Sequence, residues 1–157
     1  MATYTAFEEL EVWQLARRFA RSVYALTQEG SFSRDFRLKD QINAAAESIM
    51  SNIAEGFERD GAREFAQALS VSKGSAGEAR SQLYTALDRN HISPEAFQEL
   101  NAEALVIASQ LAGLMHYLKR APYRGLKFAK EPFNPYPPNK PKKSETRNQK
   151  SEIRNEK

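Results

Sequence analysis

The residues best suited to chemistry lie on the polar faces of two predicted helices. On the first of these two helices, which is predicted to start between residues 35 and 39, polar side chains recur at spacings of three, four and seven residues. This spacing places them on one helical face. They are Gln41, Ser48, Asn52, Glu55 and Arg59. A fully solvated face is normally richer in Lys and Glu, so this composition indicates partial enclosure. We therefore predict a hydrogen-bonding network or a subunit contact along this face.

A second polar face, which includes Ser75 and Glu78, follows on the next predicted helix. Glu55 and Glu78 invite comparison with the acid and base of a hydrolase. Such catalysis also needs an oriented nucleophile and a site for developing negative charge, and the sequence offers neither. We assign Ser75 and Glu78 to the structural network and predict no catalytic residue and no enzyme activity.

The chain has few side chains that could bind a metal ion or a cofactor. It has no cysteine and two histidines, His91 and His116. Neither histidine belongs to the Glu-x-x-His motif that di-metal helical bundles use. We interpret His91 as a turn residue and His116 as a polar edge residue, and we predict no metal and no cofactor.

Two glycines, Gly74 and Gly77, fall within a predicted helix. The surrounding residues lack the spacing and the preceding strand of a phosphate-binding loop. Each glycine costs a helix interior about 1 kcal/mol relative to alanine, so something must offset that cost. We expect the close approach of another helix, with local flexibility as the alternative.

Cationic side chains form the candidate nucleic-acid contacts. Those in the predicted helices are Arg17, Arg18, Arg21 and Arg63, and those beyond them are Arg124, Lys127 and Lys130. In the latter segment cations alternate with aromatic residues, a pattern that suits single-stranded RNA through charge and stacking. For the helical arginines the alternative is a solvated face with ion pairs. For the C-terminal segment it is a strap held across the folded domain by its aromatic rings.

Apolar periodicity predicts the four helices that must position these side chains. They cover residues 7–27, a second helix that starts between 35 and 39 and ends near 55 or 57, residues 62–89 and residues 94–120. Ser93 and Pro94 give a strong start signal for the fourth helix. Because the connections are short, the sequence predicts an all-α, antiparallel, up-down-up-down four-helix bundle.

Composition divides the chain of 157 residues into residues 1–120, a bundle domain, and residues 121–157, a Pro-rich basic tail. The first part has 13 Lys and Arg against 16 Asp and Glu, and the second has 10 against 4. The tail composition, with a seven-residue repeat after Lys143, predicts disorder. Without cysteines, a secretory signal or a membrane-spanning run, the expected location is the cytoplasm.

Two short motifs occur together on consecutive predicted helices, Asn-Ile-Ala-Glu-Gly at 52–56 and Gly-Ser-x-x-Glu at 74–78. They are accompanied, in order along the chain, by Phe7, residues 10–13, Ala16, Leu38, residues 40–42, Ser48, Ile49, Ser51, Phe57, Arg59, Glu64, Phe65 and Leu83. Over roughly residues 7–120 this pattern resembles a known family, the 23S rRNA intervening-sequence proteins. The resemblance implies a small bacterial four-helix bundle that forms a ring-like homopentamer. It implies no activity, because the biochemical role of the family is unsettled.

The chain departs from the family pattern after Ile42, where a pair of arginines is usual and Asn43 and Ala44 stand here. We therefore expect a non-enzymatic, oligomeric helical-bundle protein associated with RNA or a ribonucleoprotein. The alternative is a protein-interaction scaffold that does not bind nucleic acid. No membrane partner and no small-molecule substrate are predicted.

Overall fold

The computed structural model describes residues 4–120, which form four long α-helices and two short 3-10 helices. The long helices are α1 (Glu11–Thr27), α2 (Phe36–Glu58), α3 (Ala62–Asp88) and α4 (Pro94–Arg120). The 3-10 helices are η1 (Phe7–Glu9) before α1 and η2 (Gly30–Arg34) between α1 and α2. The predicted tail, residues 121–157, lies outside the described residues.

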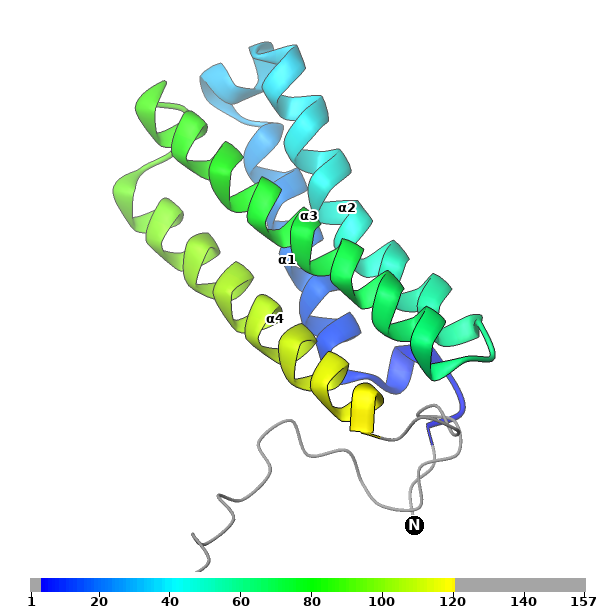
Figure 1. The fold of residues 1–157 in the computed structure, drawn as a ribbon. Coiled ribbons are helices and arrows are strands. Elements are labelled where there is room, and N and C mark those ends of the chain that lie inside the picture. The colour runs from blue at the N-terminus through cyan, green and yellow to red at the C-terminus, as the bar shows by residue number, and fades with distance from the viewer. Residues whose placement is uncertain (1–3, 121–157) are drawn as a thin grey trace, which may run out of the picture.

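The four helices form an up-down-up-down bundle (Figure 1). Each helix packs against its neighbour along the chain, and α4 returns to pack against α1, so α1 and α3 lie on one diagonal. This arrangement confirms the predicted fold. Among the described residues, no helix has the length and apolar character needed to cross a membrane.

Local chemistry explains where the helices begin. The Asp35 carboxylate accepts a hydrogen bond from the Leu38 amide at 3.4 Å and caps α2. The Ser93 hydroxyl accepts one from the Ala96 amide at 3.1 Å and caps α4, as predicted. One boundary prediction was wrong, because residues 7–27 are not one helix. Leu10 adopts an extended conformation and is buried, which separates η1 from α1.

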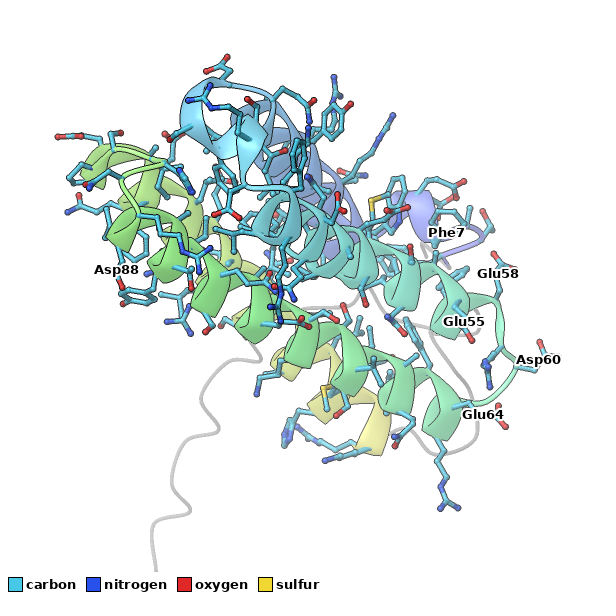
Figure 2. All side chains as sticks on the ribbon, turned by 90° about the horizontal axis from the view of Figure 1, so that it is seen from above. Phe7, Glu55, Glu58, Asp60, Glu64 and Asp88 are labelled. Carbon is cyan, nitrogen blue, oxygen red and sulfur yellow. The ribbon has the colours of Figure 1, made fainter. Side chains whose placement is uncertain are left out.

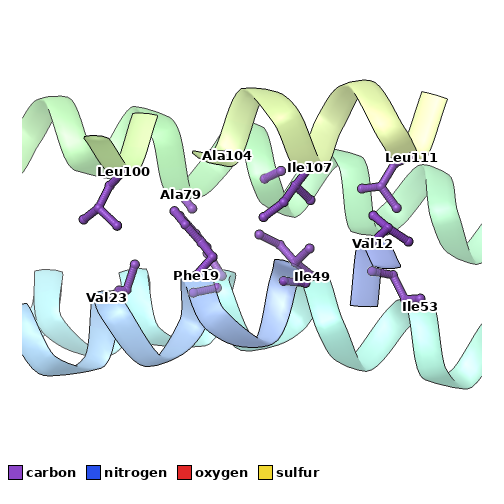
Figure 3. Packing of buried hydrophobic residues seen from close by; sticks show 14 of the residues in the cluster. Val12, Phe19, Val23, Ile49, Ile53, Ala79, Leu100, Ala104, Ile107 and Leu111 are labelled. Carbon is purple, nitrogen blue, oxygen red and sulfur yellow. The ribbon is translucent and has the colours of Figure 1, made fainter. Parts of the chain in front are cut away.

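The core is a continuous set of apolar side chains from all four helices (Figure 3). The apolar side chains that recur at helical spacing on α2, such as Ile42, Ile49 and Ile53, are fully buried. On α4, helical spacing also allows an apolar face through Ala108 and Met115. Ile107 and Leu114 lie in the centre instead, and Ala108 and Met115 are half-buried at its edge.

The α2 and α3 helices approach each other closely along the seam between them. A Cβ atom built on Gly56 would lie 2.6 Å from the Cβ atom of Ala68 and 2.9 Å from Cδ2 of Phe65. Ser72 is fully buried, and its hydroxyl donates to the carbonyl oxygen of Ile49 at 2.7 Å. Small residues therefore let the two backbones approach, and a hydroxyl joins them directly.

Candidate functional site

Three of the residues assigned to the polar network, Ser48, Asn52 and Ser75, form hydrogen bonds with one another at the middle of the α2–α3 seam. The hydroxyls of Ser48 and Ser75 lie 2.8 Å apart and link the two helices. The Asn52 amide nitrogen donates to the Ser48 hydroxyl at 3.0 Å and to the Ser48 carbonyl at 2.8 Å. Ser75 is buried and the other two side chains are half-buried, so these three residues form a shielded interhelical network.

The other predicted network residues are exposed in the single chain. Glu55 and Arg59 form an i, i+4 ion pair of 2.7 Å in which both side chains are more than half exposed. The Gln82 amide donates to Glu78 at 3.2 Å. These contacts run along one helix and do not join α2 to α3. A subunit contact at Glu55, Arg59 and Glu78 therefore stays a prediction.

Gln41 lies farther along the same seam, beside a hollow of about 320 Å³ that Arg37, Thr85 and Arg89 also line. Gln82 lines this hollow too, and its Oε1 atom is buried without a hydrogen-bond partner among the described residues. An unpartnered buried acceptor is uncommon in folded proteins. Along the seam, the polar side chains around Ser48 are therefore hydrogen-bonded to one another, whereas a buried acceptor beside the hollow at Gln41 lacks a partner in the described residues.

The candidate cations fall on separate faces. Arg17, Arg18 and Arg21 are exposed on α1, and none of the three has an ion-pair partner within 4 Å in residues 4–120. The Arg17 guanidinium lies 5.7 Å from the centre of the Trp13 ring. Burial raises the pKa of Glu103, as does the negative charge of Glu99, and Arg18 opposes this rise.

Arg63 does not join the α1 group, because α1 and α3 lie on a diagonal of the bundle. It lines a hollow of about 510 Å³ between the start of α3 and the end of α4, together with Met115, Leu118 and Lys119. The remaining candidates, Arg124, Lys127 and Lys130, lie outside the described residues.

Asn43, the point of departure from the family pattern, has a role inside the chain. Its amide nitrogen donates to the buried Thr27 hydroxyl and to the Lys39 carbonyl, both at 2.9 Å. It therefore ties α2 to the end of α1.

Sequence reasoning missed a cluster at the end of the bundle where α3 finishes. The His91 ring places Nε2 2.8 Å from the Asp35 carboxylate and Nδ1 2.7 Å from the Ser31 hydroxyl, and it stacks on Phe32. Arg89 pairs with the same carboxylate oxygen at 2.8 Å. The hydrogen bonds from His91 and Arg89 lower the pKa of Asp35 to about 2.

The predicted start of the second helix included residue 35, but the side-chain partners of Asp35 lie 54 and 56 residues away in the sequence. We assign the cluster a structural role, because Asp35 also caps α2. His91 lies in a turn, as predicted, and His116 is exposed on α4. Within residues 4–120, no three His, Cys, Asp or Glu side chains are grouped so that they could hold a metal ion.

The glycines of α3 do not meet the expectation of a close helix within the chain. Gly74 and Gly77 are exposed, and a Cβ atom added to either would have no neighbour within 4 Å. The close approach occurs at Gly56 instead.

Comparison with known proteins agrees with the fold. A solved structure from Bacteroides thetaiotaomicron, described as a protein with unknown function from the S23 ribosomal protein family, has a TM-score of 0.61 and 20% identity. The match covers 66% of this chain and 97% of that one. No curated protein matches the chain. The family model for the 23S rRNA-intervening sequence protein matches residues 8–113, which include α1, α2, α3 and most of α4. The chain therefore belongs to the 23S rRNA-intervening sequence protein family.

Proposed function

We propose that this protein is a non-enzymatic, homo-oligomeric helical bundle that associates with RNA or a ribonucleoprotein through Arg17, Arg18 and Arg21. The observation that carries the proposal is the exposure of these three arginines within little more than one turn of α1, without ion-pair partners in the described residues. Guanidinium groups suit phosphate, because their planar donors bind two oxygens at once.

The three arginines of α1 stand out because the folded domain as a whole is acidic. Residues 1–120 have an excess of three acidic groups, so general attraction to a polyanion is weak. Binding would then depend on a local row of cations and on avidity between subunits. The exposed residues Gln41, Glu55, Arg59 and Glu78 are our candidates for the subunit contact.

A salt series tests the proposal. We expect a labelled RNA hairpin to bind the full chain at low salt and to lose affinity as salt rises. Changing Arg17, Arg18 and Arg21 together to Gln should reduce the slope of log affinity against log salt by about 2, at about 0.7 for each phosphate contact.

The matched control changes three other exposed cations, Arg34, Arg37 and Lys73, to Gln, which alters the net charge by the same amount. It should leave the slope nearly unchanged. Equal losses in the two variants would show that net charge alone is responsible, and salt-independent binding would remove the phosphate contacts altogether.

A second candidate function is a scaffold for a basic protein partner. It is favoured by the acidic end of the bundle, where Glu55, Glu58, Asp60 and Glu64 gather around the turn between α2 and α3 (Figure 2). A partner that survives nuclease treatment in a pull-down, and is lost when Asp60 and Glu64 are changed to Lys, would favour this function over RNA association.

A further inference from the structure

One face of α3 carries cations along most of its length and no carboxylate. Its residues recur at alternating spacings of three and four, so they form one line along the helix. Three of its seven members are cationic, although residues 1–120 as a whole have an excess of three acidic groups. This line, which we call the α3 stripe, consists of Arg63, Ala66, Ser70, Lys73, Gly77, Arg80 and Tyr84.

Contacts with α4 fix where one end of the α3 stripe lies. The Tyr84 ring packs on the Phe97 ring, with ring centres 4.6 Å apart. One turn away, Nε of Arg80 donates to Oδ1 of Asn101 at 2.9 Å. The α3 stripe therefore follows the outer edge of the α3–α4 contact, where the two helices lie side by side (Figure 1).

The other end of the α3 stripe borders the hollow of about 510 Å³ beside the end of α4. Its apolar lining includes Met115 and Leu118, and the exposed Lys119 lies at its edge. Lys119 adds a cation from α4 to those of the stripe. The positive charge thus extends from Arg80 to this end of the bundle.

The carboxylates of the two helices lie elsewhere. Glu78 accepts a hydrogen bond from Gln82, which lines the hollow shared with α2. Glu103 lies near enough to Arg18 of α1 for the two charges to interact, and Glu64 belongs to the acidic end of the bundle. Within residues 4–120, no carboxylate oxygen lies within 4 Å of a cation of the α3 stripe. Their charge is therefore available to an anion.

Tyr84 supplies an exposed aromatic ring beside one of these cations. It is 50% exposed, while Phe97 supports its ring. Nucleobases stack on such rings with little dependence on sequence. The guanidinium of Arg80, which Asn101 holds in place, has planar donors that suit phosphate. A stacked base and its phosphate would find partners one helical turn apart.

Gly77 keeps the α3 stripe shallow between Lys73 and Arg80. It is exposed, and a Cβ atom added to it would have no neighbour within 4 Å. Glycine costs a helix interior about 1 kcal/mol relative to alanine, and no close neighbour in the described chain accounts for that cost. A position without a side chain lets a ligand come close to the helix backbone. A sugar-phosphate chain passing between the two cations would use this space.

We propose that the α3 stripe binds single-stranded RNA, with phosphates on Arg63, Lys73 and Arg80, a base stacked on Tyr84 and the strand lying against Gly77. From its first to its last residue the stripe is about 30 Å long at 1.5 Å per residue, enough for several nucleotides. The proposal rests on the RNA association proposed above. It adds a surface separate from the arginines of α1, because α1 and α3 lie on a diagonal of the bundle.

Charge and ring together select this occupant. Residues 121–157 of the chain itself have 10 Lys and Arg against 4 Glu, so the cations of the α3 stripe would repel them. An acidic peptide would meet the cations but would leave the ring of Tyr84 without a stacking partner.

Binding of a labelled, unstructured oligouridylate of about ten nucleotides to the full chain tests the proposal. Affinity should fall as salt rises. Tyr84→Leu keeps an apolar side chain against Phe97 but removes the ring. It should weaken binding by about 5- to 140-fold, the range for the loss of one stacked base. Tyr84→Phe keeps the ring and should bind like the natural protein. Equal affinities of the Leu and Phe variants would overturn the proposal.

The open space at Gly77 gives a test without a change of charge. Gly77→Gln should weaken oligouridylate binding several-fold, because its side chain would occupy the path of the strand. The matched control is Gly74→Gln, at an exposed position off the α3 stripe. Glutamine favours a helix more than glycine does, so neither change should lower the melting temperature. Equal affinities of these two variants would contradict the predicted path.

The hairpin used above separates this proposal from the function on which it rests. Paired bases are not free to stack, so Tyr84→Leu should leave hairpin affinity unchanged, and Lys73 can belong to the control there. Hairpin binding without oligouridylate binding would overturn the α3 stripe alone, and absence of both would overturn both proposals. Displacement of the oligouridylate by polyglutamate of equal charge would indicate a surface for acidic peptides and overturn the assignment to RNA.

Discussion

The contacts at the middle of the α2–α3 seam and the α4 face, which is the exposed side of α4 around Leu105 and Val106, are both made of uncharged residues, but they differ in what lies against them. In the seam, every small or polar residue at the closest approach has a neighbour in the same chain: Gly56 meets Ala68, Ser72 meets Ile49 and Ser75 meets Ser48. On the α4 face, Leu105 and Val106 face outward without such neighbours in the described chain. An uncharged helix face therefore indicates a contact, and only the structure shows whether the chain supplies it.

The largest expected effect on stability comes from replacing leucine by alanine, and it should differ between the two regions. Leu69→Ala in the seam should reduce the free energy of unfolding by about 2–5 kcal/mol, because Leu69 is fully buried and a cavity would remain. Leu105→Ala on the α4 face should change it by no more than about 0.5 kcal/mol. Urea unfolding at low protein concentration measures both, and similar losses would show that the α4 face is buried in the folded chain.

A pair of glycines sharpens the comparison. Gly56→Ala should destabilise the protein by about 1–3 kcal/mol, because its new methyl group would overlap Ala68 and Phe65. Gly74→Ala should stabilise it by up to about 1 kcal/mol, since alanine favours the helix and the space is open. Thermal unfolding of the two variants gives the signs, and a destabilised Gly74→Ala variant would indicate a contact at that surface.

The hydroxyl pair of the seam should have a smaller effect. Ser75→Ala removes one neutral hydrogen bond to Ser48, which is worth about 0.5–1.5 kcal/mol. Ser48 keeps its bond from Asn52, so the loss should stay in this range. Ser81→Ala, at an exposed position of the same helix, is the control and should be close to neutral. A Ser75→Ala variant as stable as the control would remove the network from the account of the seam.

The smallest and most condition-dependent effect concerns the far end of the seam. Hydrogen bonds from His91 and Arg89 lower the pKa of Asp35 from 3.8 to about 2. A lowered pKa stabilises the fold above the unfolded value, and this contribution is lost as the pH falls toward the folded value. Asp35→Asn keeps a capping side chain but removes the charge.

We therefore expect Asp35→Asn to lower the melting temperature near neutral pH. The difference from the natural protein should shrink as the pH falls from about 4 to about 2. A difference that is constant over this range would show that the carboxylate charge contributes nothing.

Periodic apolar residues predicted the helices and most of the core, because burial of Ile42, Ile49 and Ile53 depends on helical spacing alone. The spacing of apolar residues could not show the break at Leu10. There the backbone is extended and the side chain is buried, so the chain does not continue as one helix from η1 into α1. Spacing also could not show which helix approaches a glycine, so Gly74 was expected to make the contact that Gly56 makes.

For the candidate site, too, contacts between residues close in sequence could be predicted, whereas contacts between residues far apart in sequence could not. Ser48 and Asn52 are one turn apart, so helical spacing alone brings them together, and Ser75 joins them from the facing side of α3. Ser31, Asp35 and His91 come together only after two helices have packed, so nothing in their local sequence linked them. Glu55 and Glu78 lie on the predicted helical faces and are exposed in the described chain, so a subunit contact at these two residues stays a prediction.

The contacts of Asp35 also bear on which helices unfold first when the native protein opens locally. Asp35 joins the start of α2 to Arg89 and His91 just after α3, while the short turn around Gly61 joins the opposite ends of these helices. The α2–α3 hairpin is thus closed at both ends, whereas no ion pair within residues 4–120 joins α1 to α4. In native-state hydrogen exchange we expect the amides of α1 and α4 to exchange through partial openings, and those at the centre of the hairpin only through global unfolding.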